Sequence, residues 1–128
     1  MTRINIVPVT ELSDQHLIAE YRELPRVLKQ NVNIANAPIK YVLGKGHVKW
    51  AQKHCLFILN RFKQIIIEME YRGFNHRYGV EGLTLFNDND YLVTIEDIDL
   101  NRNRIKERYN IRPNWYRWTK RNKPLWLM

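Results

Sequence analysis

Residues 47–72 are the part of the sequence that most restricts how this chain can fold. Their apolar side chains recur at helical spacing and form one stripe: Val48, Ala51, Cys55, Ile58, Phe62, Ile65 and Met69. An amphipathic helix buries such a stripe against other elements. Gly73 comes next, and glycine is the residue type that most often ends a helix. We therefore predict one long core helix over residues 47–72.

Two further segments combine helical spacing with signals for a helix end. Ser13 is a good N-cap for a helix that runs to about Leu28. Thr94, with Asp97 three residues later, has the pattern of a capping box. The helix that it begins should continue to about Tyr109, before a proline. Three main helices are therefore predicted.

The remaining segments are predicted to be loops. Residues 31–45 and 75–89 lack helical periodicity, and residues 83–95, which could also form a short hairpin, are predicted to be irregular. No repeat, low-complexity stretch or Gly/Ser linker marks a boundary, and 128 residues is the size of one domain. We predict an all-α, compact single domain over residues 1–128, made of three main helices with long irregular loops.

Cysteine content and hydropathy restrict the compartment. Cys55 is the single cysteine of the sequence, so no internal disulfide can form and a reducing compartment suits the chain. No apolar run approaches the ~18 residues needed to cross a bilayer, and the first residues lack a signal-peptide core. We expect a cytoplasmic protein with no membrane partner.

The net charge is concentrated at the C-terminal end. Residues 1–100 hold twelve basic and twelve acidic residues, whereas residues 101–128 hold nine basic residues and one acidic residue, so the whole net charge of +8 lies there. The same segment contains Trp115, Tyr116, Trp118 and Trp126. Basic residues interleaved with aromatic residues suit a phosphate backbone whose bases can stack. The pattern favours nucleic acid, the alternative being a solvated basic terminus whose aromatic rings pack on the core.

Two predicted helix faces carry pairs of arginines. On the first helix, one line of side chains contains Gln15, Ala19, Arg22 and Arg26, and the adjacent line contains His16, Glu20 and Glu23. This arrangement puts two arginines next to a carboxylate on an exposed face. Arg104 and Arg108 lie four residues apart on the third helix. Surface ion pairs, which are worth little, would also explain both patterns.

The second residue offers a nucleophile. Thr2 follows Met1, and removal of the initiator methionine would expose a threonine α-amine. The ordinary pKa of an α-amine is about 7.7–8.0, so this group is substantially neutral near physiological pH. The four histidines and the single cysteine, in contrast, lack the spacing of zinc ligands. We therefore expect no metal and no other cofactor.

Four segments of the sequence together resemble one enzyme family. They are MTRINIVPVTELSDQHLIAEYRELPRV (1–27), LGKGHV (43–48), RGFN (72–75) and RPNWYRW (112–118). In these segments the chain resembles the phage-type pyrimidine-dimer DNA glycosylases, also called phage-type endonuclease V. The resemblance implies a DNA repair enzyme that removes one base of a UV-induced cyclobutane pyrimidine dimer and then nicks the strand. Such a bifunctional glycosylase and abasic-site lyase would work without a cofactor in a bacterial or phage-infected cell.

The resemblance also implies roles for individual residues. Thr2 corresponds to the amine nucleophile, which forms an imine with the sugar, and Glu23 corresponds to the acidic catalyst. Taken with the helix faces above, the residues predicted to contact DNA are Arg3, Gln15, His16, Arg22, Arg26, Arg104, Arg108, Trp115, Tyr116, Arg117 and Trp118. The expected partner is double-stranded DNA that contains pyrimidine dimers or abasic sites, and the expected state is a monomer.

Two other functions stay open from the sequence. The first is a non-catalytic module that recognises kinked or damaged duplex DNA, and borohydride trapping of an imine would distinguish it from an enzyme. The second is an RNA-binding accessory protein, which the stacking aromatic residues would also suit. Competition between UV-irradiated duplex DNA and RNA would test that alternative.

Overall fold

The computed structural model describes residues 4–128, so Thr2 and Arg3 lie outside the described residues. In this part of the chain the helices are α1 (Asp14–Leu28), α2 (His47–Lys53), α3 (Cys55–Arg72) and α4 (Ile95–Ile111), with two 3-10 helices, η1 (Val9–Glu11) and η2 (Leu125–Leu127). Residues 4–128 contain no strand. The predicted all-α fold is therefore confirmed, and residues 83–94 are irregular as expected.

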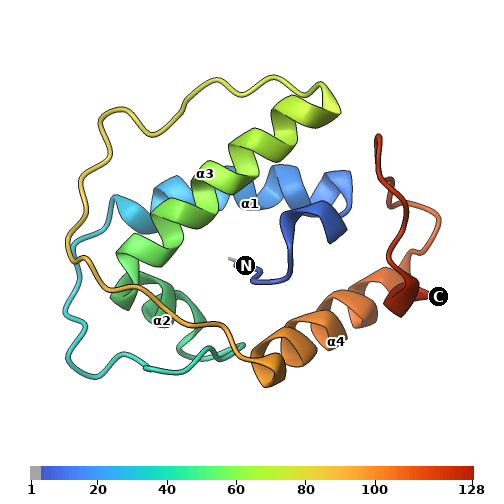
Figure 1. The fold of residues 1–128 in the computed structure, drawn as a ribbon. Helices are drawn as coiled ribbons and strands as arrows, with labels where there is room; N and C mark the ends of the chain where they lie inside the picture. Colours follow the sequence, from blue (N-terminus) through green and yellow to red (C-terminus); the bar gives the residue numbers. More distant parts are fainter. Residues whose placement is uncertain (1–3) are drawn as a thin grey trace.

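Helices α1 and α3 pack against each other at the centre of the molecule (Figure 1). The contact buries Leu17 and Leu24 of α1 and Ile58, Phe62 and Ile65 of α3, each 0% exposed. Full burial of a side chain of this size contributes about 1.5–3 kcal/mol to folding. The apolar stripe predicted in residues 47–72 is thus part of the core.

The residues at three helix ends form the caps that the sequence predicts. The Ser13 hydroxyl accepts a hydrogen bond from the His16 backbone N–H at 3.1 Å, and this contact caps α1. Thr94 and Asp97 form both hydrogen bonds of a capping box at the start of α4. Gly73 ends α3 with a φ of +85°, a left-handed conformation that favours glycine. The caps satisfy backbone groups that helix ends leave without partners.

The prediction of one continuous helix over residues 47–72 is wrong at His54, so residues 4–128 contain four α-helices instead of three. His54 has φ −119° and ψ 58°, and it separates α2 from α3. The side chain of Asn87, from the loop before α4, lies at this break. Its Oδ1 accepts a hydrogen bond from the Cys55 N–H at 3.1 Å, and its Nδ2 donates to the Gln52 carbonyl at 2.9 Å. Because a distant loop supplies these partners, the periodicity of residues 47–72 does not reveal the break.

The C-terminal tail, residues 112–128, returns along η1 and the start of α1 (Figure 1). The Asp14 N–H donates to the Arg117 carbonyl at 2.7 Å, and the Asp14 carboxylate accepts hydrogen bonds from the backbone and hydroxyl of Thr119. Arg72 of α3 also contacts Asp14, at 2.9 Å. These contacts attach the tail to the start of α1, which Arg72 in turn links to α3.

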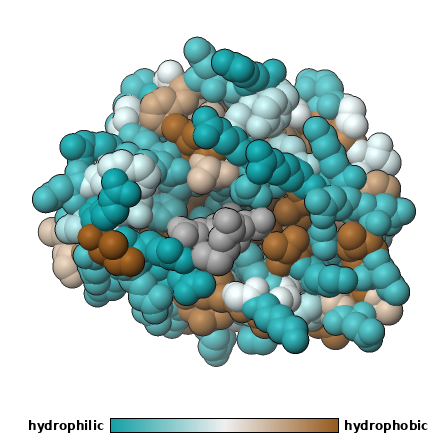
Figure 2. Space-filling view, turned by 180° about the vertical axis from the view of Figure 1, so that it is seen from behind, coloured by the Kyte–Doolittle hydropathy of each residue, from teal (hydrophilic) through white to brown (hydrophobic). Residues whose placement is uncertain are grey.

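One face of the molecule is mostly hydrophilic, and its apolar side chains appear as separate patches (Figure 2). Within residues 4–128, no helix has both the length and the hydropathy to cross a membrane.

Candidate functional site

Glu23 lines a cavity of about 370 Å³ beside α1, which we call the Glu23 cavity. Its lining is Asn5, His16, Ala19, Glu20, Arg22, Glu23 and Arg26. The Glu23 carboxylate accepts a hydrogen bond from Nη1 of Arg26 at 3.1 Å, and its side chain is 22% exposed, against 70% for Arg26. The structure thus brings the predicted acidic catalyst together with both predicted arginines of α1. A carboxylate at a cavity wall can accept a proton or stabilise a cation.

Glu20 differs from Glu23, although both were expected on the exposed face of this helix. Glu20 is 1% exposed, and its carboxylate accepts a hydrogen bond from Nε of Arg61 at 2.7 Å. A buried charge needs such a partner, since an unpaired one is costly to remove from water. Glu20 therefore forms a structural ion pair at the inner wall of the cavity, whereas Glu23 is open to it.

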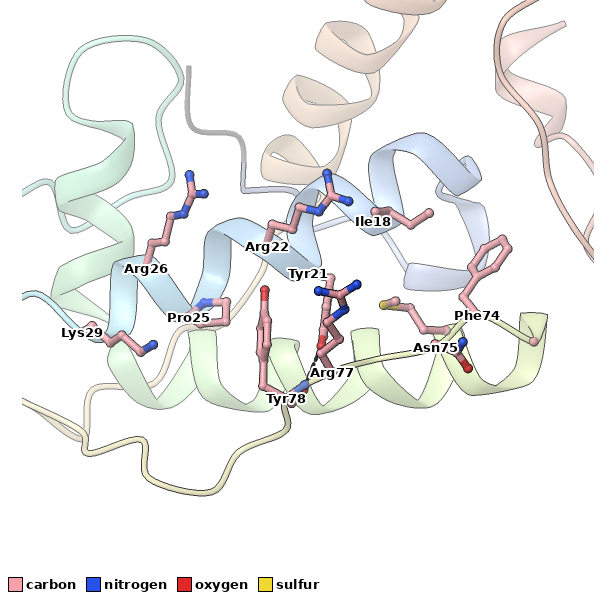
Figure 3. A pocket seen from close by; sticks show the side chains of 12 residues that line it. Ile18, Tyr21, Arg22, Pro25, Arg26, Lys29, Phe74, Asn75, Arg77 and Tyr78 are labelled. Carbon is pink, nitrogen blue, oxygen red and sulfur yellow. Dashed lines mark hydrogen bonds between the residues drawn. The ribbon is translucent and has the colours of Figure 1, made fainter.

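Arg22 and Arg26 also line a larger cavity of about 830 Å³, between α1 and the loop that follows α3. We call it the Tyr78 cavity. Figure 3 shows the two arginines extending from α1 one turn apart, with Tyr78 facing this helix from the loop. The Tyr21 hydroxyl donates to the Tyr78 carbonyl at 2.9 Å and accepts from its N–H at 3.0 Å. Both arginines therefore border two cavities.

Sequence reasoning did not identify the remaining charged and aromatic residues of the Tyr78 cavity, which are Lys29, Phe74, Arg77 and Tyr78. Three of them belong to the segment after α3, which has no periodic pattern. The one signal available was local composition: Phe74, Arg77 and Tyr78 follow closely on the end of a core helix.

Gln15 and His16 connect the start of α1 to the tail. The Gln15 side chain donates to the Trp115 carbonyl at 2.9 Å and accepts from the Arg117 N–H at 3.1 Å. The His16 and Tyr116 rings are stacked, with centroids 5.0 Å apart and planes at 4°. Because His16 lines the Glu23 cavity, the tail adjoins that cavity through this ring.

The three other predicted tail residues differ in exposure. Trp115 is 48% exposed, and the Arg112 guanidinium lies 4.9 Å from the centre of its ring. Arg117 is exposed, and it donates to the Asn114 carbonyl at 2.7 Å. Trp118 donates its indole N–H to a carbonyl of η1 at 3.0 Å and packs against the core. Trp115 and Arg117 are thus accessible to a ligand, whereas Trp118 holds the tail in place.

Arg104 and Arg108 line neither cavity. Both are on α4, which contributes no residue to the Glu23 cavity or the Tyr78 cavity. Nη1 of Arg104 is 3.7 Å from the carboxylate of Glu107, a weak surface pair. The predicted basic residues thus form two basic regions, the arginines of α1, which line the cavities, and those of α4, which do not.

Two buried histidines are hydrogen-bonded to the backbone. His47 and His54 are each nearly inaccessible, and burial lowers the pKa of both imidazoles below the ordinary value of 6.5. Each ring makes a hydrogen bond with a backbone carbonyl, that of Val42 for His47 and that of Trp50 for His54. Among residues 4–128, no group of three or more His, Cys, Asp or Glu side chains converges as metal ligands would.

Comparison with protein families gives a match in the N-terminal part of the chain. Residues 1–81 match the family model described as pyrimidine dimer DNA glycosylase. The matched part contains Thr2, Arg3 and the whole of α1, and thus Glu23 and the two arginines of its cavity. Helix α4 and the tail lie outside it.

Proposed function

The chain belongs to the pyrimidine dimer DNA glycosylase family, and we propose that it cleaves DNA at a pyrimidine dimer through an imine to the Thr2 amine. The observation that carries this proposal is that Asn5 and Glu23 line the same cavity. Asn5 follows Thr2 by three residues, and three residues of extended chain span at most about 11 Å. The α-amine of residue 2 can therefore reach a sugar that is bound beside the Glu23 carboxylate.

The first step of the proposed reaction is base removal. The neutral Thr2 amine attacks C1′ of the damaged nucleotide, and the electron pair of the glycosidic bond leaves with the base. Glu23 stabilises the positive charge that develops on the sugar. The amine then passes a proton to O4′ as the C1′–O4′ bond breaks and the sugar ring opens, which produces a protonated imine between C1′ and the enzyme.

The second step is strand cleavage by β-elimination. The protonated imine withdraws electrons and acidifies the hydrogen on C2′. Glu23 accepts this proton, the C–H electron pair forms a double bond between C2′ and C3′, and the 3′ phosphate leaves with the electrons of the C3′–O bond. The lyase activity thus uses the same amine and the same carboxylate as the glycosylase activity.

The proposed DNA contacts follow the two basic regions. Arg22 and Arg26 border the cavity of the reacting sugar, so we assign them to phosphates next to the lesion. Gln15 and His16 connect the start of α1 to the tail residues Trp115, Tyr116 and Arg117. We assign these tail residues to the support of a distorted duplex. Arg104 and Arg108, on α4, would contact the backbone further away.

Borohydride trapping on a duplex with one abasic site tests the mechanism. Reduction of the imine should link the protein covalently to DNA, and mass spectrometry of the adduct should locate the sugar on the amine of residue 2. A matched protein with an acetylated N-terminus should still bind the duplex but give no adduct. Thr2→Ala should retain much of the activity, because the hydroxyl is not the attacking group.

The opposite results would contradict the proposal. An adduct on a lysine, or nicking that survives acetylation, would rule out the Thr2 amine. DNA binding without any adduct would favour a non-catalytic module that recognises damaged duplex.

A further inference from the structure

Residues 4–7 run through the middle of the molecule, between the helices (Figure 1), and side chains hold their backbone instead of a paired strand. The Ile4 N–H donates to Nε2 of His47 at 2.9 Å, and the Ile4 carbonyl accepts from the hydroxyl of Tyr41 at 2.8 Å. The first described residue therefore has both backbone groups bound.

The next three residues are held in the same way. The Asn5 N–H donates to the Glu20 carboxylate at 3.3 Å. The N–H groups of Ile6 and Val7 both donate to Oδ1 of Asn101, at 2.7 and 3.1 Å. The holding side chains come from α1, α2, α4 and the loop before α2, and all are at most 6% exposed.

The contacts of His47 determine its tautomer. The Val42 carbonyl can only accept, so Nδ1 of His47, 2.8 Å away, must carry a proton. The Ile4 N–H can only donate, so Nε2 must be unprotonated. A doubly protonated ring would have an N–H at Nε2 that faces the Ile4 N–H, and the contact would break.

We propose that His47 is a positioning residue for the N-terminal amine, and that it acts only in its neutral form. By holding Ile4, which comes two residues after Thr2, it fixes the point from which the chain leads to the amine. This inference rests on the proposed function, since it concerns the amine that we assign as nucleophile. No catalytic contact of His47 itself is involved.

Burial, and not the charged groups around it, keeps the pKa of His47 low and favours the neutral ring. Burial has the largest effect and lowers the pKa of the ring. The Glu20 carboxylate raises this pKa, and Arg104 of α4 lowers it. Glu20 is in turn paired with Arg61 of α3. The Tyr41 ring lies edge-on to the imidazole, with ring centroids 5.7 Å apart. Burial raises the pKa of the Tyr41 phenol, so this group is uncharged near neutral pH.

The experiment measures the single-turnover rate of borohydride trapping at saturating protein on an abasic duplex, near neutral pH. Three variants are compared with the unchanged protein: His47→Leu, His47→Gln and His54→Leu. Leucine removes both hydrogen bonds of His47, whereas the glutamine amide can donate to the Val42 carbonyl and accept from the Ile4 N–H. His54 is the matched control, because it is equally buried and bonds the Trp50 carbonyl instead of residues 4–7.

We expect His47→Leu to slow trapping by about 10- to 100-fold, since small misplacements of a reacting group have effects of this size. Its affinity for a duplex with a non-reactive abasic analogue should stay within about threefold, because the DNA-binding arginines are unchanged. His47→Gln should restore most of the rate, and His54→Leu should lose stability but keep the rate. Below pH 6.5, the rate of the unchanged protein should fall more steeply with pH than that of His47→Gln, whose side chain does not titrate.

Tyr41→Phe is the second variant if His47→Leu does not fold. It removes the hydroxyl that holds the Ile4 carbonyl and leaves the ring in place, so it should also slow trapping with unchanged affinity. The inference is overturned if His47→Leu traps as fast as His54→Leu, or if Tyr41→Phe leaves the rate unchanged. Absence of trapping in the unchanged protein would instead contradict the proposed function.

Discussion

The imidazole of His16 lies parallel to the phenol ring of Tyr116, at a centroid distance of 5.0 Å and an interplanar angle of 4°. Nδ1 of His16 is also 2.8 Å from the hydroxyl of Ser13, which caps α1. One ring of the Glu23 cavity is thus held between the first helix and the tail. The tail can therefore influence the shape of the site even where it does not touch the substrate.

Tyr116→Leu should weaken this connection. A stacked aromatic pair contributes about 0.5–1.5 kcal/mol beyond the area it buries, so the free energy of unfolding should fall by about 1 kcal/mol. The His16 ring protons should move downfield in the NMR spectrum as the ring current is lost, and nicking of dimer-containing DNA should slow. Tyr71→Leu is a suitable control, because Tyr71 contacts the tail residue Arg121 but lines neither cavity. Equal effects of both variants on nicking would contradict a specific role for the stack.

Glu23→Gln should abolish catalysis while preserving binding. The amide keeps the size of the side chain but can neither accept the C2′ proton nor stabilise a cation, so turnover should fall by about 100-fold or more. Affinity for dimer-containing duplex should change little, because the charge matters most in the transition state. Glu81, an exposed carboxylate outside both cavities, provides the control Glu81→Gln. A parallel loss of affinity in Glu23→Gln would argue for a structural role of the ion pair with Arg26.

Removal of arginines from the two basic regions should have different effects. Arg104→Ala or Arg108→Ala should weaken binding to damaged and undamaged duplex alike, and each lost phosphate contact should reduce the log–log salt slope by about one. Arg22→Ala or Arg26→Ala should reduce turnover and the preference for damaged DNA more than non-specific affinity. Titrations of damaged and undamaged duplex at several salt concentrations measure these affinities and salt slopes. The same ratio of damaged to undamaged affinity in all four variants would contradict different roles for the arginines of α1 and those of α4.

Glu68 should make the protein sensitive to acid. Burial alone would raise the pKa of this carboxyl, but hydrogen bonds from Arg121 and Arg72 outweigh it and hold the pKa below the ordinary value of 4.5. The stabilisation is therefore complete above pH 4.5 and is lost as the pH falls below that value. Glu68→Gln should reduce the free energy of unfolding by about 3 kcal/mol near neutral pH, because it leaves a buried arginine less well paired. Denaturant titrations should show this difference shrinking in acid, whereas the exposed Glu70→Gln should match the unchanged protein throughout.

Features that depend on neighbouring residues were predictable from the sequence. The caps at Ser13 and Thr94 and the stop at Gly73 involve partners a few residues away, so the residue types alone indicate them. The helical spacing of Gln15, His16, Arg22, Glu23 and Arg26 likewise predicted that these side chains share one side of α1. The order Met1–Thr2 offered Thr2 as a candidate nucleophile, and resemblance to a known family then implied this role, which no periodic pattern would single out.

The tertiary structure decided which of these polar residues are buried and what they hold. Glu20 and Glu23 are both glutamates on one helix, but only Glu20 meets Arg61, a residue 41 positions away. His47 bonds Ile4 across 43 positions, and Asn101 bonds Ile6 across 95. The break at His54 likewise depends on Asn87. A buried polar group must find a partner once water is excluded, and that partner is determined by how the helices pack, whereas a helix cap is determined by residues that are adjacent in the chain.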